Sequence, residues 1–127
     1  GLLTVNALCA AASVLIPLQC EFYALEGLSQ LMRTIASVQG GLNRQLVMQG
    51  IVLTMYDGRN KLSEQVANDV RTHLGNLVYN TVIPRNVRIS EAPSFGQPVL
   101  IYDLNCAGSK AYIALAAELL EQEKEAA

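Results

Sequence analysis

The sequence is poor in the residues that build metal sites and disulfide frameworks. It contains one histidine, His73, and three cysteines, Cys9, Cys20 and Cys106, which lie far apart and form no Cys-x-x-Cys pair. Zinc sites need closely spaced cysteine and histidine ligands, so this set predicts that no metal is bound. An odd number of thiols in an apolar chain is typical of a reducing cytoplasm, because a disulfide framework pairs its cysteines. We therefore expect a cytoplasmic protein.

Long apolar runs and strong net charge are missing as well. A membrane-spanning helix needs roughly 18 or more apolar residues in a row, which no part of the chain provides. The apolar amino terminus also lacks the basic stretch that begins a signal peptide. The formal net charge is −2, so any contact with DNA has to come from a local basic patch. Hydrophobic residues make up 51% and charged residues 16% of the chain, a composition typical of one globular domain.

Three short apolar runs have the character of buried strands. They span Ser13–Pro17, Gly50–Tyr56 and Val78–Ile83, and a proline or a turn sequence ends each of them. Their apolar residues do not alternate with polar ones, so both faces of each strand should be covered. Strands buried on both faces are typical of parallel sheets packed between helices.

Two segments between these runs repeat apolar residues every three or four positions, as amphipathic helices do. One covers residues 22–38 and the other residues 62–74, where Gly75 is the expected cap. A third helix, through residues 115–120, follows the last apolar run at 99–102. Strands that alternate with helices specify crossover units, so the predicted fold is α/β, with mostly parallel strands flanked by helices.

Three stretches carry a more specific signal, namely Pro17–Leu31 (PLQCEFYALEGLSQL), Val52–Asp57 (VLTMYD) and Thr81–Pro93 (TVIPRNVRISEAP). They resemble the ParA/Soj family of the MinD/ParA superfamily, which are deviant-Walker P-loop ATPases that segregate chromosomes and plasmids. The similarity covers nearly the whole chain. It implies that residues 1–120 are the carboxy-terminal portion of such an ATPase domain, within the layered sheet of a P-loop NTPase. The charged tail at 121–127 is the one candidate for disorder.

The resemblance also indicates what this chain does not contain. Family members hold ATP and Mg²⁺ with an amino-terminal phosphate loop, whose backbone amides and lysine bind the phosphates. No Gly-x-x-x-x-Gly-Lys-[Ser/Thr] string occurs in this sequence, which begins without a methionine and which we interpret as a fragment. We predict that ATP and Mg²⁺ belong to the longer protein. This chain alone should neither bind ATP tightly nor hydrolyse it, and no catalytic residue is assigned.

The resemblance assigns the adenine-binding surface to Thr54, Met55, Pro84 and Arg85. These residues lie at or just after the carboxyl ends of two predicted strands, where open α/β sheets bind ligands. Proline and a guanidinium plane offer flat or apolar surface on which a purine can stack. The alternative is that Pro84 only ends a strand and that Arg85 is solvated.

DNA binding is the second function that the resemblance implies, and the matching residues are Arg59 and Arg88. Arginine binds phosphate through paired hydrogen bonds and releases counterions, so this binding would be independent of DNA sequence. Lys61 and Arg71 could widen the patch. The alternative is an ordinary solvated face. Near the last helix the family usually has Tyr-Asp-Pro, whereas this chain has Tyr102-Asp103-Leu104, which puts a charge contact at that helix in doubt.

For the intact protein the resemblance implies an ATP-dependent homodimer on the nucleoid, with a ParB-like partner that stimulates hydrolysis. One alternative is a MinD-like division-site ATPase, which binds membranes through a basic amphipathic helix, whereas residues 119–125 here are acidic. Another is a non-catalytic interaction domain. Because half of a parallel sheet would leave a strand edge open, we also expect self-association of the isolated chain.

Overall fold

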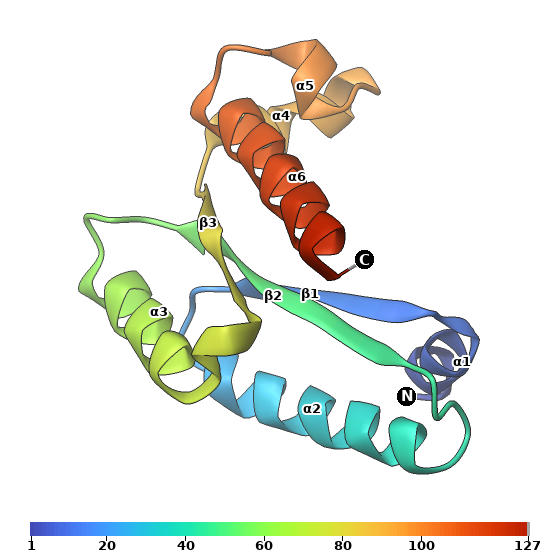
Figure 1. Cartoon of the computed structure of the whole chain (residues 1–127). Helices are drawn as coiled ribbons and strands as arrows, with labels where there is room; N and C mark the ends of the chain where they lie inside the picture. The colour runs from blue at the N-terminus through green and yellow to red at the C-terminus, as the bar shows by residue number, and fades with distance from the viewer. Residues whose placement is uncertain (127) are drawn as a thin grey trace.

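The computed structural model describes residues 1–126 as an α/β fold (Figure 1). The elements in chain order are α1 (Leu2–Ala10), β1 (Ser13–Gln19), α2 (Ala24–Gly40), β2 (Val47–Tyr56), α3 (Lys61–Leu74), the 3₁₀ turn η1 (Gly75–Leu77), β3 (Val78–Pro84), α4 (Val87–Glu91), the 3₁₀ turn η2 (Ala92–Phe95), α5 (Val99–Tyr102) and α6 (Ala107–Ala126). The predicted alternation of strands and helices is confirmed.

The sheet has three parallel strands in the order β1-β2-β3. Ile16 of β1 is paired with Ile51 of β2, and Ile51 is paired with Val78 of β3. The central strand β2 is buried continuously from Gly50 to Leu53, because helices cover it on both faces. This continuous burial is why its apolar residues do not alternate with polar ones along the sequence.

Two apolar cores lie on opposite faces of the sheet. The larger core packs β1 and β2 against α2 and α3, and Leu53 and Val70 are fully buried in it. The smaller core packs Val52 of β2 and Ile83 of β3 against Leu115 of α6. In Figure 1, α2 and α3 lie below the sheet, and α6 lies above it beside β3. Burying each such side chain contributes roughly 1.5–3 kcal/mol, so the helices are held mainly by these apolar stripes.

The helix ends follow their local chemistry. The Asn60 side chain caps α3 by accepting a hydrogen bond of 2.9 Å from the backbone N–H of Leu62, as residues at this position commonly do. Gly75 is the C-cap of α3, as predicted, with φ −50° in the right-handed region, and the chain continues from it into η1. Helix α1 was not predicted, because its residues are apolar on all sides and leave Leu2 and Leu3 exposed, with no amphipathic stripe.

The final charged residues are not disordered as far as the structure describes them. Residues 121–126 form the last turns of α6, and the Gln122 amide donates a 2.9 Å hydrogen bond to the carbonyl of Gln49. The Tyr79 hydroxyl in turn donates to Gln122 at 2.7 Å. These contacts with β2 and β3 correct the expectation of a disordered tail up to residue 126, whereas Ala127 lies outside the described residues. The predicted division of the chain into an ATPase-domain portion (1–120) and a charged tail (121–127) stays a prediction.

Side chains from two helices bind the backbone of β3 between Val78 and Val82, where the pairing of β3 with β2 shifts in register. The Glu118 carboxylate of α6 accepts the backbone N–H groups of Asn80 (2.7 Å) and Thr81 (2.8 Å). The Arg71 guanidinium of α3 donates to the carbonyl of Tyr79 at 3.1 Å. Backbone groups that the shift leaves without partners in β2 are thereby satisfied.

The β1 edge of the sheet is open within residues 1–126, because no described strand pairs with the outer side of β1. Leu15 of β1 is 38% exposed. The predicted self-association through such an edge stays a prediction. In the described part of the chain, no helix is both long and apolar enough to cross a membrane.

Candidate functional site

The carboxyl ends of β2 and β3 meet at one end of the sheet. Tyr56 is paired with Pro84, and the backbone N–H of Arg85 donates a 2.8 Å hydrogen bond to the Tyr56 carbonyl. Thr54 and Met55 immediately precede Tyr56 on β2. The structure therefore places all four predicted adenine-binding residues at the carboxyl end of the sheet, where parallel α/β sheets bind ligands.

Met55 adopts an unusual backbone conformation at this carboxyl end of the sheet. Its φ is 53°, and it is the one non-glycine residue with positive φ in the described chain. The left-handed region costs an ordinary side chain roughly 1–2 kcal/mol, and such strain is found preferentially at ligand-binding sites. The sequence carries no signal for this strain, because methionine shows no preference for left-handed positions.

Arg59 lies in the turn after β2 and is bound to Asp57. Its Nε is 3.2 Å from Asp57 Oδ1 and its Nη2 is 3.4 Å from Oδ2, while its side chain is 92% exposed. The hydrogen bonds from Arg59 hold the pKa of Asp57 below its usual value, and the charge of Arg85 lowers it further. The predicted DNA residue Arg59 and the predicted adenine residue Arg85 therefore both act on one carboxylate.

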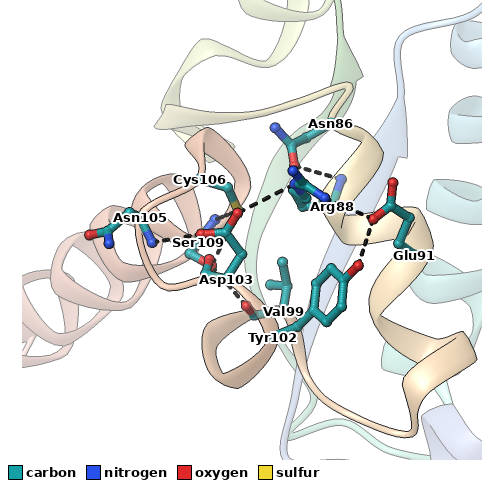
Figure 2. A network of polar contacts seen from close by, with 9 residues as sticks. All are labelled: Asn86, Arg88, Glu91, Val99, Tyr102, Asp103, Asn105, Cys106 and Ser109. Carbon is teal, nitrogen blue, oxygen red and sulfur yellow. Dashed lines mark hydrogen bonds and ion pairs between the residues drawn. The ribbon is translucent and has the colours of Figure 1, made fainter.

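Arg88 lies on α4 at the centre of a polar network (Figure 2). Its Nη1 is 3.1 Å from Glu91 Oε2, and its Nε is 3.4 Å from Asp103 Oδ2. The Tyr102 hydroxyl donates a 2.6 Å hydrogen bond to the same Glu91 oxygen. We call these four residues the Arg88 network. Asp103 is an ion-pair partner of Arg88, so a charge contact joins α4 to the segment before α6. It differs from the family's contact at the last helix, because position 107, four residues past Asp103, is alanine.

Buried contacts beneath the network hold the segment that carries Asp103. The Ser109 hydroxyl of α6 is fully buried and lies 2.6 Å from the Asp103 carbonyl and 3.1 Å from the Val99 carbonyl. A Cβ on Gly108 would lie 2.5 Å from Ile89 Cγ1, so only glycine allows α6 to approach α4 this closely. Sequence reasoning did not identify Ser109 or Gly108, because their importance comes from contacts between segments.

The two residues expected to widen the basic patch, Lys61 and Arg71, lie in different surroundings. Lys61 is exposed at the start of α3, beside the turn that carries Arg59. Arg71 instead donates to β3 carbonyls, so its guanidinium serves the sheet edge and does not extend the patch. Among residues 1–126, no group of three or more histidine, cysteine, aspartate or glutamate side chains is arranged to hold a metal ion.

Comparisons with known proteins agree with this architecture. A family described as "AAA domain" matches residues 1–48. The chain is 67% identical over 125 residues to the chromosome partitioning protein ParA of Caulobacter vibrioides (98% of this chain, 47% of the relative). It is 54% identical over 119 residues to the sporulation initiation inhibitor protein Soj of Bacillus subtilis (94% of this chain, 47% of the relative). The chain thus spans about half the length of these curated relatives.

A solved structure gives the same picture of the fold. Cobyrinic acid a,c-diamide synthase from Mycobacterium smegmatis, with bound ADP and magnesium, superposes with a TM-score of 0.73 at 34% sequence identity. The match covers 100% of this chain and 44% of that chain.

Proposed function

This chain belongs to the ParA/Soj family of chromosome-partitioning ATPases, and we propose from that premise that it is part of an ATP-dependent DNA-segregation protein. The proposal rests most on the 67% identity with Caulobacter vibrioides ParA across 98% of the chain. In the intact protein, ATP-bound subunits would pair, bind duplex DNA without sequence preference, and be released after a ParB-like partner stimulates hydrolysis. Its place in the cell would be the nucleoid, for a chromosome or a plasmid.

The division of labour that we propose gives this chain the base side of the nucleotide. Pro84 and Arg85 would contact adenine, with Thr54 and Met55 beside them at the carboxyl end of the sheet. This assignment is supported by the hydrogen bond between Arg85 and Tyr56 and by the strained backbone of Met55. ATP phosphates and Mg²⁺ would be held elsewhere in the longer protein, since no phosphate-loop string occurs here. The chain alone would then be inactive as an ATPase.

The DNA side of the proposal rests on Arg59 and Arg88. Both side chains are at least half exposed, at 92% and 51%, which supports contact with phosphate. The MinD-like alternative would require the end of α6 to lie on a membrane. In this chain that segment contacts β2 and β3 through Gln122 and Glu123 instead, which favours the DNA-binding proposal.

The experiment that tests the DNA assignment uses a chimera in which this chain replaces the matching 125-residue segment of Caulobacter vibrioides ParA. We predict that Arg88→Glu and Arg59→Glu each weaken ATP-dependent binding of duplex DNA by at least tenfold. Each lost phosphate contact should also reduce the slope of log K against log salt by about one. Fluorescence anisotropy across a salt series measures both quantities.

The matched control is Arg33→Glu, which makes the same charge change on α2, outside the proposed surface. It should cost less affinity than either test variant and leave the salt slope nearly unchanged. ATP-dependent pairing, followed by light scattering, should survive in all three variants. Equal DNA affinity in the parent chimera and Arg88→Glu would contradict the assignment.

A further inference from the structure

The Arg88 network contains more negative than positive charge, with one guanidinium beside two carboxylates, Glu91 and Asp103. We propose that these two carboxylates restrain Arg88 as intramolecular competitors of DNA phosphate, so that DNA must displace them to bind. This inference rests on the proposed function, because it concerns the same arginine. It assigns Glu91 and Asp103 as regulatory residues of the DNA surface.

The geometry of the guanidinium supports competition. Arginine binds phosphate best with two parallel N–H groups, from either the Nε and Nη2 side or the Nη1 and Nη2 end. Nη1 of Arg88 donates a hydrogen bond to Glu91, and Nε lies 3.4 Å from Asp103 Oδ2 as an ion pair. A phosphate on the second face would therefore compete with the Glu91 hydrogen bond, and a phosphate on the first face would lie beside the Asp103 carboxylate.

The carboxylates are held in place more firmly than the arginine is. Glu91 is fixed by the Tyr102 hydroxyl at 2.6 Å, and Asp103 accepts the Asn105 backbone N–H at 3.2 Å. The Asp103 backbone is in turn held by the buried hydroxyl of Ser109. Arg88 is a long side chain that is 51% exposed. Phosphate would therefore replace the carboxylates as partners of Arg88 by drawing the arginine side chain away from them.

Arg59 provides an internal comparison. It is paired with a single carboxylate, Asp57, which also feels the charge of Arg85. The Arg59 pair is therefore balanced, with one guanidinium beside one carboxylate, whereas the Arg88 network has a negative balance. Removal of a carboxylate should therefore strengthen DNA binding more at Arg88 than at Arg59.

The test introduces Glu91→Gln and Asp103→Asn separately into the same chimera. Both substitutions remove a charge and keep an acceptor of similar shape, so Tyr102 and Asn105 retain partners. We expect each variant to bind duplex DNA about two- to fivefold more tightly in the presence of ATP, the range that corresponds to an exposed ion pair. Glu121→Gln, at the far end of α6 and exposed, removes the same charge and controls for the general change in net charge.

A double-mutant cycle separates this inference from the proposed function. In an Arg88→Ala background, Glu91→Gln and Asp103→Asn should have no more effect than Glu121→Gln. If Arg88→Ala weakens DNA binding but the two carboxylate variants match Glu121→Gln, the competition is wrong and the DNA assignment stands. If Arg88→Ala leaves affinity unchanged, the assignment of Arg88 to DNA binding is wrong, and the competition inference with it. Thermal unfolding of each variant identifies any loss of fold.

Discussion

At the scale of single residues, the clearest departure from ordinary geometry is Met55. It lies at the carboxyl end of β2, next to the residues proposed to contact adenine, and its φ of 53° is unfavourable for any side chain with a Cβ. Neighbouring contacts must hold it there, such as the hydrogen bond from Arg85 to Tyr56. Strain of this kind links the shape of the backbone to a surface that a ligand could use.

This strain predicts that glycine is a more stable replacement than alanine at Met55, the reverse of the order expected inside a strand. Met55→Gly should be more stable than Met55→Ala by about 1 kcal/mol, because both lose the side chain but only glycine tolerates the left-handed conformation. At Thr54, where φ is not positive, the alanine variant should be the more stable one, as is usual inside strands. Urea unfolding of the four variants measures the differences, and the same order at both positions would contradict the interpretation.

Glu118 predicts a pH dependence. Burial by itself raises its pKa, but hydrogen bonds with Thr81 and Asn80 outweigh burial and lower the pKa below the ordinary value of 4.5. A lowered pKa means that the folded state favours the carboxylate. Its contribution to stability is therefore present above about pH 4.5 and is lost as the pH falls through the lower folded-state value.

We therefore expect Glu118→Gln to be less stable than the parent chain by about 1–3 kcal/mol at neutral pH. The difference should shrink as the pH falls below 4.5, where the parent loses the contribution of the carboxylate. Glu121→Gln, on the same helix, should change stability little at either pH. Denaturant unfolding at a series of pH values provides the comparison, and a constant difference between Glu118→Gln and the parent would count against the role of the charge.

At the scale of elements, the three strands and the helices α2, α3 and α6 were predictable because each repeats a pattern that burial imposes. The run from Gly50 to Tyr56 lies entirely in β2, and the stripe ending at Leu74 is α3. The short helices α4 and α5 were missed, since 5 and 4 residues are too few to show a period. Helix α1 was missed because it is apolar all round.

The candidate site was predictable only where a strand end identifies it. Pro84 and Arg85 could be placed from the end of β3 together with the family resemblance. Glu91 lies three residues after Arg88 on α4, a spacing that sequence alone could have flagged. Asp103 could not be predicted as a partner, because it comes from another segment whose approach depends on the close packing at Gly108. Sequence patterns report which residues face a core, whereas contacts among exposed side chains depend on the path of the loops.

The two edges of the sheet also differ at this scale. Glu118 and Arg71 bind backbone groups of β3 at Tyr79, Asn80 and Thr81. The β1 edge has no described strand beside it. If the isolated chain self-associates as the sequence predicts, the contact should form through β1.

At the scale of the whole molecule, the base-side residues lie at the carboxyl end of the sheet. The proposed DNA residues lie in the turn after β2 and on α4, which directly follows β3. Arg59 and Arg85 act on the same carboxylate of Asp57, and Arg88 follows on α4, directly after β3. Pro84 is paired with Tyr56, which lies three residues before Arg59, and Arg88 lies four residues after Pro84. A nucleotide bound beside Pro84 would therefore contact the segments that carry both arginines of the DNA proposal. In the function that we propose, this proximity would couple ATP to DNA binding.

The most direct test of this account is the ATP dependence of DNA binding by the chimera with Caulobacter vibrioides ParA, measured beside the isolated chain. We predict that the chimera binds duplex DNA of unrelated sequences tightly with Mg²⁺ and ATP and at least tenfold more weakly with ADP. The isolated chain should show neither ATP-dependent DNA binding nor ATP hydrolysis. DNA affinity of the chimera that is the same with ATP, with ADP and without nucleotide would contradict the account.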